Sequence, residues 1–187
     1  MSSVSTANLW NTEYAFHVAR QIAALRGVYC GPAVIAWIAA VWNANSNVPY
    51  DYLGRLKNKT LFDDGPRAFA HTVPGFRNNL DETLRRETQG QLRLSAKRSF
   101  RLEHIHTLIA QSGMPFIVRI PLVSLRDGLH YATIFKTEVK QQVYRCYCQD
   151  NGVISSGEKL QEGISVTTKR TGSLAFCPWG ARQVERA

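Results

Sequence analysis

Residues 29–42 read YCGPAVIAWIAAVW, and the expected fold is built around them. Pro32 suits the first turn of a helix, where its missing N–H costs nothing, so we expect Cys30 at or next to the N-cap. Alanine, valine, isoleucine and tryptophan fill the next three turns and leave almost no polar face, which predicts a helix buried on most sides. The unpaired amides and the positive dipole end at such a helix start favour a thiolate over a thiol.

The length and composition predict one soluble globular domain. The chain has 187 residues, so we expect a single domain over residues 1–187 with its core at about 15–180. Its four cysteines are too few for a disulfide scaffold. No apolar run reaches the roughly 18–20 residues that span a bilayer, and residues 1–10 lack the features of a cleavable signal. We therefore expect no transmembrane segment. The expected location is the cytoplasm of the producing cell, or secretion by a system that reads no signal peptide.

The formal net charge of +9 is the second global feature of the chain. The excess is densest over residues 85–101, which contain Arg85, Arg86, Arg93, Lys97, Arg98 and Arg101. Such a surface attracts polyanions, acidic lipid, anionic cell-wall polymer or an acidic partner; alternatively it is a solvated face that keeps the protein soluble. No zinc-finger, P-loop or RNA-binding aromatic signature accompanies the charge, so nucleic acid is not favoured as a partner.

Helical periodicity dominates the first part of the chain and extended periodicity the second. The predicted helices span residues 13–25, 30–43, 50–57, 80–88 and about 99–111. The predicted strands span residues 92–98, 114–121, 129–136, 142–149, 164–168 and 174–177. Residues 58–78 are irregular and a candidate cover for a cleft. Helices first and an antiparallel sheet second indicate an α+β domain in which the helical layer packs on the sheet.

A thiolate nucleophile needs a base within hydrogen-bond reach and a group that orients that base. His130 is the candidate base because it follows residues 127–129 (Asp-Gly-Leu) and opens an apolar strand. A strand start at the rim of a sheet can present an imidazole to a cleft; the alternative is a strand-end histidine with a structural hydrogen bond. His17 is expected on the surface of a helix, and His71 falls in the irregular segment.

The candidate orienting group follows the predicted strand over residues 142–149. Asp150 would lie on the strand next to His130, where its carboxylate could accept the imidazole N–H and fix the tautomer. Asn151 is the alternative orienter, since an amide oxygen does the same without charge. Asp-Asn-Gly at 150–152 is also a common turn sequence that needs no catalytic reason.

Metal binding has little support in the sequence. His104 and His106 are two residues apart on a predicted helix, so they point to different faces and cannot form an i, i+4 pair. Cys146 and Cys148 face the same side of a predicted strand, but together with Cys177 they lack a Cys-x-x-Cys pair and a fourth ligand. We therefore expect buried structural thiols and no metal.

Four segments in this order resemble the papain-like cysteine peptidase fold. They are Cys30-Gly31-Pro32-Ala33 at the head of a buried helix, the helix-then-strand segment 105–118, Leu129-His130-Tyr131-Ala132 on a strand, and a strand ending at Asp150. The likeness covers about residues 15–152 and is greatest to the compact bacterial branch typified by the leader-removing peptidase domains of bacteriocin transporters. Compact basic chains of this kind also resemble secreted effector toxins, including cell-wall amidases delivered by type VI secretion.

The sequence departs from the family pattern at two positions. The family usually places an oxyanion-hole glutamine about six residues before the nucleophile, where this chain has Ala24. Gln21 is the nearest glutamine and is the candidate donor, alone or with the backbone N–H of Cys30. The orienting carboxylate of the family is usually followed by proline, whereas Asp150 is followed by Asn151.

The resemblance implies a cysteine hydrolase of peptide or amide bonds that needs no cofactor. Cys30 would attack the carbonyl carbon, His130 would move the proton, and Asp150 or Asn151 would orient His130. The expected partner is a peptide or protein substrate; peptidoglycan peptide is one candidate because an anionic wall would retain a +9 chain, and a toxin would have a cognate immunity protein. Two alternatives remain open: a glutamine deamidase toxin that uses the same residues, and a basic binding or adaptor module in which Cys30 is structural.

Overall fold

The computed structural model describes residues 2–25, 27–61, 79–98, 100–121, 129–141, 143–149, 164–167 and 180–187. For residues 79, 119–121, 129–130 and 164–167 it describes the backbone alone. The helices are η1 (Asn8–Trp10), α1 (Glu13–Ala24), α2 (Cys30–Asn45), α3 (Tyr52–Lys57), α4 (Asn79–Glu87) and α5 (Leu102–Ser112). The strands are β1 (Ser2–Thr6), β2 (Leu92–Leu94), β3 (Phe116–Pro121), β4 (Leu129–Lys140), β5 (Val143–Gln149), β6 (Ile164–Thr167) and β7 (Ala181–Arg186).

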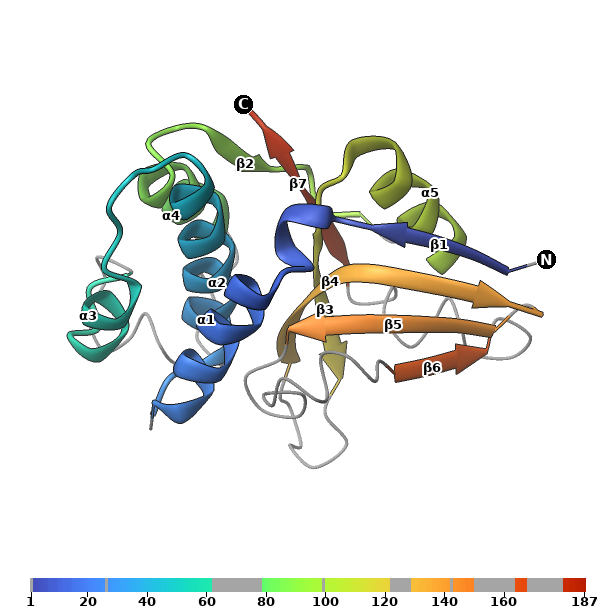
Figure 1. Cartoon of the computed structure of the whole chain (residues 1–187), viewed down its shortest axis with the longest axis horizontal. Coiled ribbons are helices and arrows are strands. Elements are labelled where there is room, and N and C mark those ends of the chain that lie inside the picture. The colour runs from blue at the N-terminus through green and yellow to red at the C-terminus, as the bar shows by residue number, and fades with distance from the viewer. Residues whose placement is uncertain are drawn as a thin grey trace.

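The strands form an antiparallel sheet in the order β2-β7-β3-β4-β5-β6. The long strand β4 runs through it, with β5 along one edge and both β3 and β1 along the other. β3 pairs with residues 129–134 of β4, and β1 pairs with residues 136–140 directly beyond them. The register of β4 with β5 shifts at a bulge between Ile134 and Lys136. The predicted antiparallel sheet is thus confirmed (Figure 1).

Helices α1 to α4 gather on one side of the molecule, and α5 lies apart from them beside β1 (Figure 1). α1 and α2 pack on β4 through aromatic side chains: the Phe135 ring lies 5.7 Å from the Trp37 ring and 5.9 Å from the Phe16 ring. Phe100, just before α5, packs edge-on against Phe116 of β3, with 5.3 Å between the ring centres. The molecule is therefore a mixed α+β structure, as the sequence predicts.

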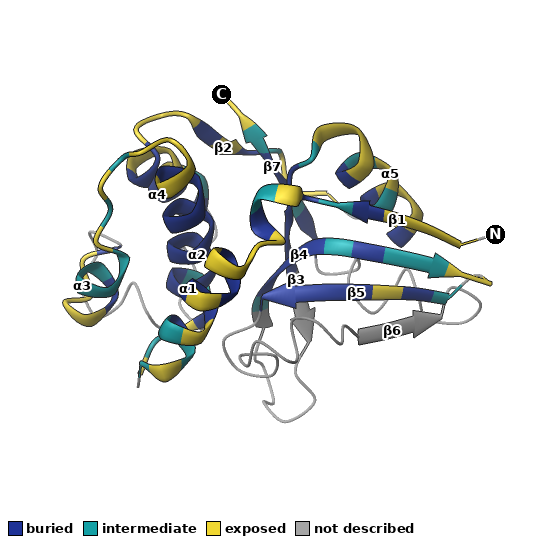
Figure 2. Ribbon diagram, viewed as in Figure 1, coloured by how far each residue is buried: buried dark blue, intermediate teal, exposed yellow. Residues whose placement is uncertain are grey.

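The core is centred on α2 (Figure 2). No residue from Ala33 to Val41 is more than 2% exposed, which confirms the prediction that this helix is buried on most sides. The indole of Trp37 donates to the carbonyl of Ala15 at 2.8 Å, so its one polar atom is satisfied against α1. Within the described residues, no helix is both long enough and apolar enough to cross a bilayer.

Several boundaries differ from those predicted. α2 continues to Asn45 because Asn43 is buried and its amide donates to the backbone carbonyl of Glu87 at 2.8 Å. The predicted strand over 92–98 pairs as a ladder only at 92–94, and Arg98 makes an isolated bridge to Ala181. β1 and β7 were not predicted. The expected strand over 174–177 lies outside the described residues, as does most of the irregular segment 58–78.

Candidate active site

Cys30 is the first residue of α2, directly after the N-cap Tyr29. No side chain caps this helix start, and its first turn carries no acidic residue. No negative charge within the first turn therefore offsets the positive end of the helix dipole. The dipole stabilises negative charge on the Cys30 sulfur. Cys30 is only 3% exposed, so neighbouring parts of the chain cover its side chain in this structure.

The strand that carries His130 begins beside this helix start. The backbone of His130 lies in β4 opposite Ile120, and its side chain lies outside the described part of the chain. The next residue, Tyr131, reaches α2: a Cβ atom placed on Gly31 would lie 4.0 Å from Tyr131 Cδ2 and 3.9 Å from Leu80 Cδ2. The side chain of Tyr131 thus faces the first turn of α2.

β5, the strand that precedes the predicted orienting group, is the neighbour of β4. It ends at Gln149, which lies opposite Thr133 of β4. Asp150 and Asn151 lie outside the described residues. The orienter hypothesis therefore keeps the strand adjacency that it requires, while the group itself stays a prediction.

Gln21, the predicted oxyanion donor, lies in the last turn of α1. α1 and α2 are consecutive helices joined by a short loop, and the hydrogen bond from Trp37 to Ala15 fixes their relative height. The hydroxyl of Tyr52 donates to Gln21 Oε1 at 3.1 Å, which leaves the amide N–H groups of Gln21 as its donors.

The other four histidines lie elsewhere in the chain and are not candidate bases. His17 and His104 are exposed, and His71 lies outside the described residues. His106 is half-buried, and both ring nitrogens meet hydroxyls: Nε2 lies 3.1 Å from Ser3 Oγ and from Ser5 Oγ, and Nδ1 lies 2.7 Å from Thr137 Oγ1. His106 therefore ties α5 to β1 and β4.

A row of paired residues that includes three polar side chains crosses the sheet next to Tyr131, and no pattern in the sequence predicts it. Arg182 of β7 lies opposite Ile117, Ile117 opposite Thr133, and Thr133 opposite Gln149. Because Thr133 is two residues from Tyr131 in a regular strand, this row lies on the sheet face that α2 covers. Thr133 Oγ1 and Gln149 Oε1 are buried with no hydrogen-bond partner among the described residues. Buried polar atoms of this kind are uncommon in folded proteins.

Arg182 is the charged member of this row. Its Nε donates to the Ser95 carbonyl at 2.8 Å. Burial lowers the pKa of Arg182, while Asp81 and Tyr131 favour its charged form. A half-buried cation therefore lies within electrostatic reach of the tyrosine that contacts the start of α2. Only the strand register reveals this arrangement, because Arg182 and Tyr131 are far apart in the sequence.

The other cysteines that the structure describes lie in the interior of a strand. Cys146 and Cys148 are buried in β5, and neither forms a disulfide. Cys177 lies outside the described residues. Among the residues that the structure describes, no three His, Cys, Asp or Glu side chains come together in a metal-binding group.

Comparison with known proteins gives no relative: no family model, no curated protein and no solved structure matches this chain.

Proposed function

We propose that this protein is a papain-like cysteine hydrolase in which Cys30 is the nucleophile and His130 the general base. The observation that carries the proposal is the contact of Tyr131 with the first turn of α2, since it brings the chain next to His130 beside the chain next to Cys30. Regular alternation along β4 would put neighbouring residues on opposite faces, and Tyr131 already faces α2. The proposal therefore requires His130, the second residue of β4, to depart from that alternation at the strand end so that its imidazole reaches the Cys30 sulfur. The helix dipole supports the thiolate form that such a nucleophile needs.

The chemistry follows from these groups. The His130 imidazole takes the proton of the Cys30 thiol, and the sulfur attacks the carbonyl carbon of a peptide or amide bond. The oxyanion of the tetrahedral intermediate accepts hydrogen bonds from the Cys30 backbone N–H and the Gln21 amide. His130 then gives its proton to the leaving amine, and a thioester with Cys30 remains. Water attacks the thioester, a proton returns to the thiol through His130, and the carboxylic acid is released.

Asp150, or Asn151 in its place, orients the imidazole. An acceptor on the ring N–H fixes the tautomer whose other nitrogen can take the thiol proton. The support for this role is that β5 pairs with β4, so a group just after β5 follows the strand next to His130.

The proposed substrate class is a peptide, with peptidoglycan stem peptides as the leading candidate because an anionic wall would hold a chain of net charge +9. The test incubates the protein with purified peptidoglycan and with Gln-containing proteins and measures intact masses. Fragments that depend on Cys30 support a peptidase or amidase. A mass gain of about one unit without fragments indicates the deamidase alternative. If no product depends on Cys30, the hydrolase proposal fails and the alternative of a basic adaptor module remains.

A cellular experiment separates the possible targets. The chain is expressed in a bacterium with and without an export signal, as wild type, as Cys30→Ala and as Cys148→Ala. Cys148 is the matched control because it is an equally buried cysteine away from the helix start. Lysis that needs export and Cys30, but not Cys148, supports a wall substrate. Toxicity without export supports a cytoplasmic protein as substrate.

A further inference from the structure

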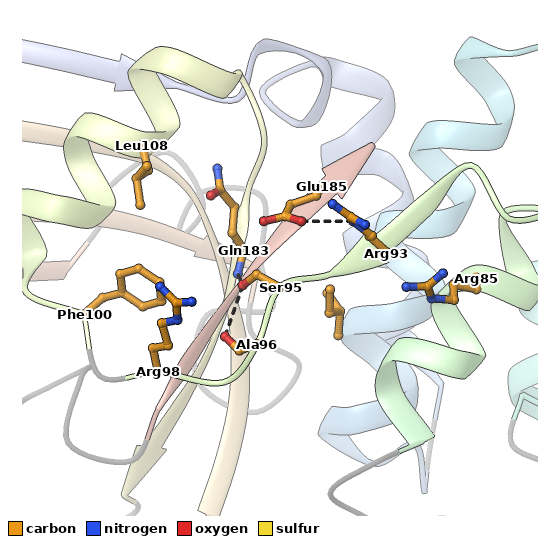
Figure 3. Close-up of a pocket in the computed structure, with 10 residues that line it drawn as sticks. Arg85, Arg93, Ser95, Ala96, Arg98, Phe100, Leu108, Gln183 and Glu185 are labelled. Atoms are coloured by element: carbon orange, nitrogen blue, oxygen red, sulfur yellow. Dashed lines mark hydrogen bonds and ion pairs between the residues drawn. The ribbon is translucent and has the colours of Figure 1, made fainter. Parts of the chain in front are cut away.

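A concave pocket of about 430 Å³ lies at the β2–β7 end of the sheet. Gln183 and Glu185 of β7 line it, together with Arg93 of β2, the segment that follows β2, and Phe100 and Leu108 at α5 (Figure 3). The lining is held in place by its own hydrogen bonds: the Ser95 hydroxyl accepts from the Gln183 backbone N–H at 2.8 Å, and the Gln183 amide donates to Ser112 Oγ at 2.7 Å.

The pocket lies on the sheet face opposite to α2. Gln183 is paired with Phe116, and Phe116 with Ile134. Ile134 is three residues from Tyr131 in a regular stretch of β4, so its side chain points to the opposite face from Tyr131. A ligand in this pocket would therefore not compete with a substrate at Cys30.

Three arginines line this pocket against one glutamate. Arg93 pairs with Glu185 at 3.1 Å, and Arg85 pairs with Asp81 at 2.9 Å. Both arginines are about half-exposed, so these pairs are weak and can be exchanged for a ligand. Arg98 also lines the pocket, and among the described residues no carboxylate pairs with it.

The charges favour a ligand with two negative charges on one group. A single carboxylate could neutralise Arg98, but to engage Arg93 as well it would have to replace a carboxylate that is already present. A phosphate monoester carries about 1.5 to 2 negative charges and three acceptor oxygens, and guanidinium groups bind such oxygens in a bidentate manner. Phe100 and Leu108 provide apolar surface for the group that carries the phosphate.

We propose that this pocket binds a dianionic phosphate group, either as the free ion or as a small phosphate monoester. Arg98 and Arg93 hold the phosphate oxygens, Arg85 adds charge at the rim, and Glu185 limits the affinity by competing for Arg93. The site is independent of the proposed hydrolase activity.

The test is a ³¹P NMR titration of the whole chain with inorganic phosphate and with phenyl phosphate, and benzoate serves as the monocarboxylate competitor. We expect saturable binding of the phosphates that benzoate does not displace at equal concentration. Arg98→Gln weakens binding at least about tenfold, the usual effect of losing a hydrogen bond between charged groups. Glu185→Gln strengthens binding several-fold, because Arg93 is then free of its competitor. Tighter binding of phenyl phosphate assigns an ester as the ligand, and equal binding assigns the free ion; both support the proposal.

The matched control is Arg20→Gln, which removes an exposed arginine from α1, on the other side of the sheet. Equal losses of affinity for Arg20→Gln and Arg98→Gln would mean that phosphate responds only to net charge, and would overturn the site. Displacement by benzoate, or weaker binding in Glu185→Gln, would overturn it as well. Thermal melting of each variant shows that it is folded. Cys30→Ala should bind phosphate as the wild type does, so failure of the hydrolase proposal leaves this one standing.

Discussion

Tyr131 of β4 lies against Gly31 of α2, and a Cβ on that glycine would lie 4.0 Å from the tyrosine ring. This contact joins the helix that begins at Cys30 to the strand that begins at Leu129. Leu80 and Tyr131 leave room beside Gly31 for a methyl group, and a larger side chain would have to displace one of them. The helix-to-strand contact thus sets how close the two candidate catalytic residues can come.

Substitutions at Gly31 test this contact. Gly31→Ala should leave the free energy of unfolding unchanged or raise it by up to about 1 kcal/mol, since the added methyl meets its neighbours at ordinary van der Waals distance and alanine favours helix. Gly31→Leu should lower it by about 1–3 kcal/mol, because the extra atoms must displace Leu80 or Tyr131. Urea unfolding followed by tryptophan fluorescence measures both. Equal stability of the two variants would show that the helix start is not packed against β4.

The buried carboxylate of Glu87 predicts an asymmetric effect of mutation. Its side chain is fully buried and pairs with Arg55 at 2.9 Å and with Arg86 at 3.0 Å, whereas both arginines are partly exposed. Glu87→Gln leaves two cations that can turn to water, so we expect a loss of about 1–3 kcal/mol of stability. Arg55→Ala with Arg86→Ala leaves the carboxylate buried without either of its cations, and we expect a loss of about 3–5 kcal/mol.

The control for this comparison is the exposed pair of Arg93 and Glu185. Arg93→Ala should change stability by less than about 1 kcal/mol in the same denaturation experiment. If Glu87→Gln proved more damaging than the double arginine variant, the cost of burying an unpaired charge would not be what holds this cluster together.

His106 predicts a loss of stability in mild acid. Burial lowers the pKa of His106 from its usual 6.5, so the folded protein binds this proton less readily than the unfolded chain does. The contribution of neutral His106 to the free energy of unfolding is therefore complete above about pH 6.5. It is lost as the pH falls through the lowered pKa. Melting temperatures from pH 7.5 to 5, with hydrogen exchange at β1, should show this loss. His106→Asn should flatten the profile, and His104→Asn, an exposed neighbour on α5, should not; a flattened profile in His104→Asn alone would refute the assignment to His106.

The helices were predicted well from the sequence because their signals are local. The apolar run of α2, the break near Gly27 and the left-handed Gly113 at the end of α5 each act within a few residues. β7 was missed because its stability is not local: ARQVER carries three charges, yet it lies in the sheet between β2 and β3 and buries Ala181 and Val184 there. β1 was missed for the same reason. This short strand is stabilised by its pairing with β4 and by the hydrogen bonds of Ser3 and Ser5 to His106.

One structural feature of the candidate site, the position of Cys30, was predicted from the sequence because its signal is local. The position of Cys30 at a helix start follows from Pro32 and the apolar residues after it, so sequence alone could find it. The polar row of Arg182, Thr133 and Gln149 depends on the pairing of four strands, and no spacing in the sequence encodes it. Likewise the pocket lined by Arg93 and Arg98 arises only when β2 pairs with β7.

The most direct test of the central claim measures how fast Cys30 reacts with iodoacetamide at pH 6, with the labelled peptide identified by mass spectrometry to separate it from the other cysteines. The proposed pairing of Cys30 with His130 predicts a rate at least about tenfold above that of a free thiol, and loss of this advantage in His130→Ala. A Cys30 that reacts no faster than a free thiol, or equally fast with and without His130, would contradict the account.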